Sequence, residues 1–265
     1  MKRQALLFVV AIQFLTRLPV PNLEGFQTSW LSESARYFPL VGALVGAIGV
    51  CVWWLSSMVF PPAVAIGLMM SASLLLTGAF HEDGLADVCD GFGGGRNREA
   101  VLAIMKDSRV GAYGAIGVAM MLGLKWSVLA SLPYATFPMI VVAAHVASRW
   151  CAIGIIWRLN YIRPDVEAKS RPLANSLSGR NWLLSGVLGA IVLLPGFLLF
   201  DPAIRSQLAV ALLAALALSL IGTVFAGMYF RNRIGGYTGD CLGAAQQLAE
   251  LGFLLTTLGV LAETQ

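Results

Sequence analysis

The chain has 265 residues, of which 58% are hydrophobic and only 12% are charged. A soluble domain carries about 25% charged residues, so an ordinary water-facing surface is excluded. The net charge of +4 suits contact with anionic lipids, and no basic cluster on a polar domain indicates nucleic-acid binding. The four cysteines lie far apart without a CxxC pair, so we expect free thiols rather than disulfides or a zinc site.

Seven apolar stretches approach the length of about 20 residues that a membrane-spanning helix needs. In chain order they are residues 38–60, 62–80, 111–132, 137–157, 183–200, 207–229 and 241–262. Residues 5–18 are shorter and are expected to lie at the interface or to pack as a half-helix, and without a small-x-small cleavage site we expect them to be retained. The sequence therefore predicts an all-α, polytopic integral membrane protein with one membrane-embedded domain over residues 1–265.

The positively charged residues of the loops are predicted to lie mostly on one side of the membrane. The N-terminus and residues 19–37, 81–110, 158–182 and 230–240 hold fifteen of the 18 Lys and Arg residues. Only Arg205 falls on the other side, while Lys125 and Arg149 lie within spans. Because basic loops stay in the cytoplasm, the loaded face is predicted to be cytoplasmic. The opposite loops are very short, so we expect function at the cytoplasmic face.

Three aspartates follow the second apolar stretch. Asp83, Asp87 and Asp90 are spaced i, i+4 and i+7, which places them on one face of a helix. Adjacent carboxylates repel one another unless a cation lies between them, and Mg²⁺ binds carboxylate, water and phosphate oxygens. A solvated acidic loop is the alternative, but unpaired charge at membrane level is costly. We predict a catalytic metal site here, with Glu82 or Asp90 as a general base and His81 in the adjoining substrate site.

Glycines and cations follow these acids. The run from Gly91 to Gly95 is expected to end the helix, and it is either a phosphate-binding loop or a flexible linker. Lys106 and Arg109, with Asp107 and Ser108 between them, either bind substrate phosphates or anchor the next span. We favour substrate binding for these four residues.

A second glycine-rich segment precedes the last span. Arg231 and Arg233, then Gly235, Gly236 and Thr238, form a candidate anion cradle, in which the threonine could cap the following helix. Asp240 would then lie in the first helical turn, where a carboxylate complements the helix dipole. Its predicted place on the same face as the other aspartates makes it a candidate metal ligand and substrate-binding residue as well.

Two polar residues lie inside the fourth apolar stretch. Arg149 is close enough to the cytoplasmic end to reach a substrate there, whereas His145 lies deeper and is expected to be a buried, hydrogen-bonded histidine. Lys125, within the third stretch, is interpreted as extending toward the far interface. The loop over residues 158–182 could cover the site or be a basic juxtamembrane segment, and the sequence leaves both open.

Several motifs together resemble the family of bacterial cobalamin synthases, the adenosylcobinamide-GDP ribazoletransferases. The resemblance lies in residues 78–94, with GAFHEDGLADVCDGFGG, in residues 105–114, with MKDSRVGAYG, and in residues 235–244, with GGYTGDCLGA. FLTRLPVP at 14–21 and RYFPLVG at 36–42 also look like this family, so the likeness touches nearly the whole chain.

The resemblance implies a transferase of the bacterial inner membrane. Such an enzyme joins adenosylcobinamide-GDP to α-ribazole, or to its 5′-phosphate, with Mg²⁺ and with release of GMP. These small molecules and the lipid bilayer are the expected partners, and a homo-oligomer stays open. The alternatives are a phosphotransferase of the CDP-alcohol type, which also gathers aspartates at the cytoplasmic face, and a secondary transporter, against which the absence of an internal repeat argues.

Overall fold

The computed structural model describes the chain except for residues 1, 22, 24, 26, 163–175 and 263–265. The helices of the described part are α1 (Lys2–Leu15), α2 (Thr28–Ser34), the 3₁₀ turn η1 (Ala35–Tyr37), α3 (Phe38–Ser56), α4 (Pro62–Thr77), α5 (Phe80–Gly94), α6 (Arg98–Lys106), α7 (Ala112–Ser131), α8 (Phe137–Arg158), α9 (Gly179–Leu198), α10 (Pro202–Ile234) and α11 (Gly239–Ala262). The one β-bridge among the described residues joins Tyr161 and Tyr237. The predicted all-α class is confirmed.

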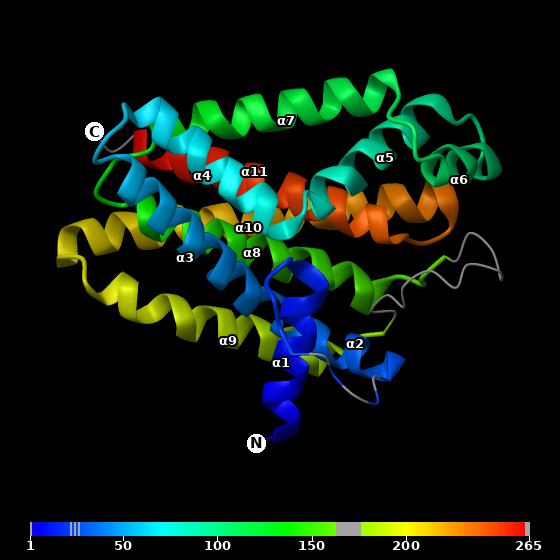
Figure 1. Ribbon diagram of the computed structural model, residues 1–265, viewed down its shortest axis with the longest axis horizontal. Helices are drawn as coiled ribbons and strands as arrows, with labels where there is room; N and C mark the ends of the chain where they lie inside the picture. Colours follow the sequence, from blue (N-terminus) through cyan, green and yellow to red (C-terminus); the bar gives the residue numbers. More distant parts are fainter. Residues whose placement is uncertain (1, 22, 24, 26, 163–175, 263–265) are drawn as a thin grey trace.

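Six helical stretches of the described chain are long and apolar enough to cross a membrane: residues 29–56, α7, α8, α9, α10 and α11. A seventh crossing is available if the bent pair of α4 and α5 counts as one span. The protein is thus a polytopic, multi-pass membrane protein. The connections α3–α4, α7–α8 and α9–α10 lie at one end of the bundle, and the α5–α6 and α10–α11 connections lie at the other (Figure 1).

Helix α8 forms the centre of the bundle, with α3, α9, α10 and α11 packed around it. Its side chains are buried along almost the whole length, as expected for a span that lipid does not reach. Small residues allow the close approach: a Cβ atom at Gly42 of α3 would lie 2.3 Å from the carbonyl oxygen of His145 in α8. By contrast, α9 and α10 leave large apolar side chains exposed on the outside of the bundle.

The second predicted span, residues 62–80, ends three residues early at a sharp bend, and the predicted helix of the acidic motif is confirmed as a separate element. Helix α4 ends at Thr77, and α5 begins at Phe80 after a bend of 87°. Gly78 and Ala79 both adopt left-handed backbone conformations, with φ of 68° and 53°. Such a conformation is costly for alanine and ends the α4 hydrogen-bond ladder. The acidic motif therefore lies on a second helix that packs against α7 and α11.

Two further boundaries differ from the sequence prediction. Helix α10 has 33 residues, which at 1.5 Å per residue is about 50 Å and exceeds a hydrocarbon core of about 30 Å. Arg231 and Arg233 consequently lie in the last helical turn rather than in a loop. Helix α1 runs across the direction of the long helices and packs against α2, η1 and α3 (Figure 1). It is too short to be a span by itself.

Candidate active site

Two helices bring together three of the predicted carboxylates. Asp83 and Asp87 lie on α5, and Asp240 lies in the first turn of α11, as predicted. The carboxyl of Asp87 is within electrostatic range of both Asp240 and Asp83, and Asp240 is in turn within range of Asp83. Asp83 is exposed, and the other two are half-buried. We call these three residues the acidic cluster.

Glycines allow α5 and α11 to approach closely at the acidic cluster. A Cβ atom at Gly84 would lie 2.9 Å from the Cα atom of Asp240, and one at Gly243 would lie 3.1 Å from the carbonyl oxygen of His81. A larger residue at either position would push the helices apart. The backbone contact therefore fixes Asp240 beside the acids of α5.

The acidic cluster can be tested as a metal site by its donors. No three His, Cys, Asp or Glu side chains in the described residues are arranged to hold a metal ion by themselves. Mg²⁺ does not need such a cage, because it commonly takes one or two protein carboxylates and completes its octahedron with water and phosphate oxygens. The three like charges, with the exposed Asp83 among them, fit this mode of binding.

Asp90, which we predicted as a metal ligand and base, lies within electrostatic range of Asp87 and also contacts the start of α7. It is 8% exposed, and its two carboxyl oxygens accept hydrogen bonds from the backbone amides of Gly111 and Gly114, at 2.7 and 2.9 Å. These amides belong to the start of α7, where backbone N–H groups lack intrahelical partners and favour an anion. Through these two hydrogen bonds, Asp90 connects α5 to the start of α7.

Glu82 and His81 point into the bundle rather than toward the acidic cluster. The Oε1 atom of Glu82 accepts a hydrogen bond of 2.8 Å from Gln247 in α11. His81 is 5% exposed and lines two interior cavities. Residues three and four apart share a helix face, whereas neighbours such as Glu82 and Asp83 diverge. Helix geometry thus separates Glu82 from the aspartates.

The short segment after α6 carries an ion pair on the surface. Both Nε and a terminal nitrogen of Arg109 donate to the carboxylate of Asp107, the former at 3.0 Å. These hydrogen bonds lower the pKa of Asp107 to about 2. Lys106 and Ser108 are exposed beside this pair. Lys106 and Arg109 are thus both on the surface, and the charge of Arg109 is partly neutralised by Asp107.

The predicted glycine-arginine cradle divides into different roles. Arg233 donates to the carbonyl oxygen of Gly95 at 2.7 Å and so binds the C-terminal end of α5, where carbonyls lack helical partners. Arg231 is exposed. The Oγ1 atom of Thr238 accepts a hydrogen bond from the amide of Cys241 at 3.4 Å, so the predicted cap of α11 is confirmed.

The two glycines between these residues have backbone reasons to be glycine. Gly235 ends α10 with a φ of 86°. At Gly236 a Cβ atom would lie 2.2 Å from the carbonyl oxygen of Asn160, which accepts a hydrogen bond from Tyr237. The predicted turn is confirmed, and it packs on residues 160–162. The role left open for the loop over residues 158–182 concerns mostly residues 163–175, which lie outside the described residues.

The glycine run after the aspartates also serves packing. Helix α5 continues to Gly94, so the run does end the helix. A Cβ atom at Gly91 would lie 2.4 Å from Cγ of Met105, and one at Gly93 would lie 2.8 Å from the ring of Tyr113. These glycines let α6 and the start of α7 lie directly on α5. The run therefore serves the packing of α5 against its neighbours.

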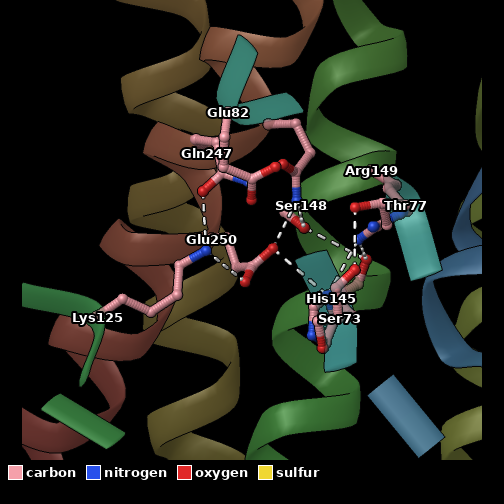
Figure 2. A network of polar contacts seen from close by, with 10 residues as sticks. Ser73, Thr77, Glu82, Lys125, His145, Ser148, Arg149, Gln247 and Glu250 are labelled. Atoms are coloured by element: carbon pink, nitrogen blue, oxygen red, sulfur yellow. Dashed lines mark hydrogen bonds and ion pairs between the residues drawn. The ribbon is translucent and has the colours of Figure 1, made fainter. Parts of the chain in front are cut away.

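A group of polar side chains in the middle of the bundle was not predicted as a unit (Figure 2). The Nζ atom of Lys125 lies 3.0 Å from Glu250, and Nδ1 of His145 lies 3.4 Å from the same carboxylate. Gln246 and Gln247 connect Glu250 to Ser148 and Glu82 through side-chain hydrogen bonds. We call this group, together with Arg149, the buried network; its members are Glu82, Lys125, His145, Ser148, Arg149, Gln246, Gln247 and Glu250.

Two expectations about this group were wrong. Lys125 does not extend to the far interface, because it is 7% exposed and paired with Glu250. Arg149 does not reach the cytoplasmic end, because it is 3% exposed and donates to the carbonyl oxygen of His145 at 3.1 Å. The sequence carried a signal for this arrangement, since Glu250 is an intramembrane acid that requires a partner.

The sequence of this chain is similar to those of a known protein family. The model of the family described as cobalamin-5-phosphate synthase matches residues 7–258. The adenosylcobinamide-GDP ribazoletransferase of Ralstonia nicotianae is 48% identical over 91% of this chain and 90% of its own length. That of Leptothrix cholodnii is 44% identical over 95% and 94%. The chain belongs to the cobalamin-5-phosphate synthase family.

Membership in this family confirms the resemblance inferred from the motifs. A third relative of the same name, from Shewanella frigidimarina, is 42% identical over 97% of this chain and 96% of its own length. The protein is accordingly an enzyme, a transferase of cobalamin synthesis. No solved structure matches the chain.

Proposed function

We propose that this protein joins adenosylcobinamide-GDP to α-ribazole, or to its 5′-phosphate, and releases GMP in a reaction that requires Mg²⁺. The relatives that match almost the full chain carry the name adenosylcobinamide-GDP ribazoletransferase. The observation that carries the proposal is the acidic cluster, because it gathers three carboxylates from α5 and α11, and no cation of the described residues acts on Asp87 or Asp240. A diphosphate with Mg²⁺ supplies the charge that such a cluster requires.

The residues of the acidic cluster would hold Mg²⁺ against the diphosphate of the activated substrate. A bound Mg²⁺ ion supplies charge neutralisation at the phosphate oxygens and orients the diphosphate for displacement. Asp87 and Asp240 form the half-buried side of the cluster, and Asp83 forms the exposed side. This arrangement leaves one side open, from which the substrate phosphates can approach.

Exposed cations at the same end of the bundle as α5 are suited to the leaving GMP. Arg231 at the end of α10 and Lys106 at the end of α6 both lie at the same end of the bundle as α5. Arg233 contributes indirectly, because its hydrogen bonds to α5 orient the helix that carries the aspartates. Arginine binds phosphate through two parallel donors, which favours Arg231 for the diphosphate.

The proposed transfer is one displacement at phosphorus. A ribose hydroxyl of α-ribazole attacks the phosphorus linked to cobinamide, and a new P–O bond forms. The anhydride bond between the two phosphorus atoms breaks, GMP leaves with its electron pair, and the hydroxyl proton is released. Glu82 and Asp90, which we first considered as bases, are each held by other partners.

The direct test is an assay with purified protein in lipid vesicles. Adenosylcobinamide-GDP, α-ribazole and Mg²⁺ should yield adenosylcobalamin and GMP in equal amounts, and EDTA should stop the reaction. A parallel reaction with CDP-activated lipid and an alcohol tests the CDP-alcohol alternative. Turnover of that pair without cobalamin formation would overturn the proposed function.

We further propose that the protein lies in the bacterial inner membrane with the acidic cluster facing the cytoplasm. The one-sided distribution of Lys and Arg supports this orientation. Tyr134, between α7 and α8, is 69% exposed, and Ser176 is exposed before α9. In a background without native cysteines, Tyr134→Cys should react with an impermeant maleimide added to spheroplasts, whereas Ser176→Cys should react only after lysis. The reverse pattern would invert the proposed orientation.

A further inference from the structure

The start of α5 lies deep in the bundle, next to the buried network. Lys125 is thirteen residues beyond the first residue of α7, about 20 Å along the helix. Glu250 is eleven residues beyond the first residue of α11, about 16 Å. Glu82, in the first turn of α5, reaches this level and accepts a hydrogen bond from Gln247, which itself accepts one from Lys125 at 2.8 Å. Figure 2 shows this chain of contacts.

A small cavity adjoins these contacts. Its volume is about 40 Å³, and its polar lining includes Glu82, Lys125, Arg149 and Glu250. The Oε2 atom of Glu82 and the Nε atom of Arg149 are buried without a hydrogen-bond partner. A cavity of this size holds about two to four waters by the usual requirement of roughly 10–15 Å³ for each. Such waters would satisfy both atoms, and the cavity is too small for a substrate.

The contact between Glu82 and Gln247 connects two helices that share the acidic cluster. Asp83 follows Glu82 in the chain, and Asp240 lies seven residues before Gln247, two turns away on the same face of α11. The start of α5 has no side-chain cap and follows two left-handed residues, whereas its far end is held by Arg233 and by the contact of Asp90 with α7. The glycine contact at Gly84 sets the helix separation, but it leaves rotation of α5 to side chains.

We propose that Gln247 and Glu82 are positioning residues that set the rotation of α5 and thereby direct Asp83 and Asp87 toward Asp240. This role rests on the proposed Mg²⁺-dependent function of the acidic cluster. Glu82 acts as a structural anchor for the cluster rather than as the general base. Gln247 acts on the acidic cluster through Glu82. It contacts Glu82, Lys125 and Gln246 and belongs to the buried network.

The first experiment measures metal binding without turnover. Mn²⁺ binding to the full protein in lipid, followed by electron paramagnetic resonance, should be weakened by Gln247→Leu by about 10- to 100-fold, as for other groups that orient metal ligands. Gln247→Asn, which shortens the side chain but keeps the amide, is the milder variant and should weaken binding in the same direction. Leu248→Ala, at the adjoining position that is 49% exposed, is the matched control and should bind as wild type does.

The second experiment exchanges the two partners. Glu82→Gln combined with Gln247→Glu keeps one carboxylate, one amide and their contact, but moves the charge to α11. A positioning contact predicts Mn²⁺ affinity and kcat within about 3-fold of wild type for the exchange, because the geometry set by the pair is kept. A general base at position 82 predicts a loss of about 100- to 10,000-fold in kcat for both Glu82→Gln and the exchange, with Mn²⁺ affinity unchanged.

The outcomes separate this inference from the proposed function. If wild-type protein binds Mn²⁺ and both Gln247 variants bind it equally well, the positioning role is overturned and the metal site stands. If wild type binds no Mn²⁺, the metal site fails and this role fails with it. Recovery of Mn²⁺ affinity and kcat in the exchange, after their loss in Gln247→Leu, would establish the positioning role.

Discussion

The acidic cluster and the buried network both include residues of α5 and α11, and the network also takes Lys125 from α7 and three residues from α8. Their charges are arranged in opposite ways. The acidic cluster collects carboxylates, one of them exposed, with no cation among its own members. The buried network pairs Lys125 with Glu250 and surrounds both with amide donors and acceptors. Clustered carboxylates near solvent repel one another unless a cation binds between them, whereas the opposite charges in the interior neutralise one another. We therefore expect the acidic cluster to act in the reaction and the buried network to stabilise the helix bundle.

Breaking the ion pair of the buried network should give the largest effect, and it should be an effect on stability. Glu250→Leu leaves the ammonium of Lys125 buried without its carboxylate, which costs about 3 to 5 kcal/mol. Thermal unfolding in lipid should show the loss. Adding Lys125→Met removes the orphaned charge and should recover most of it. A double variant as unstable as the single one would contradict the architectural role of the pair.

Removing charge from the acidic cluster should act on turnover. Asp83→Asn and Asp87→Asn keep the side-chain volume, and each should lower kcat by about 100-fold or more, which corresponds to roughly 3 kcal/mol. Folding should be retained, because fewer like charges remain in contact. Cys89→Ala on another face of α5 is the control. Near-normal turnover of both variants at low Mg²⁺ would show that the acidic cluster is a solvated acidic surface and not a metal site.

The two arginines at the end of α10 provide a smaller and more selective contrast. Arg231→Lys keeps the charge but loses the paired donors, and we expect the KM for adenosylcobinamide-GDP to rise about 10-fold. Arg233→Lys should instead lower the unfolding temperature, because it loses hydrogen bonds to the end of α5. Steady-state kinetics and thermal unfolding separate the two. Equal kinetic defects would mean that both arginines bind substrate.

Asp90 should show the smallest effect. Asp90→Ala removes the acceptor of two amides at the start of α7 and should cost about 1 kcal/mol of stability, as for other helix caps. Mn²⁺ affinity should stay unchanged if Asp90 is not a ligand. Weaker Mn²⁺ binding with unchanged stability would show that Asp90 is a metal ligand, as the sequence analysis predicted.

Composition and periodicity determined the membrane class and the helices. Residues 137–157 were predicted as a span and form α8 almost to the residue, because a long apolar run has no other stable structure in lipid. The cap by Thr238 and the place of Asp240 in the first turn of α11 were also predicted, since both depend on residues within four positions of each other. Free cysteines were expected and are confirmed.

Only the tertiary structure decided which polar residues meet. At the bend between α4 and α5, Gly78 is a sequence signal for the end of α4, but the positive φ of Ala79, which follows it, could not be predicted because alanine rarely adopts that conformation. That bend carries Glu82 inward to Gln247 and leaves Asp83 at the exposed side, although the two are neighbours in the chain. The pairing of Lys125 with Glu250 joins residues 125 positions apart. Such contacts depend on how the helices pack, and local sequence determines only the helices themselves.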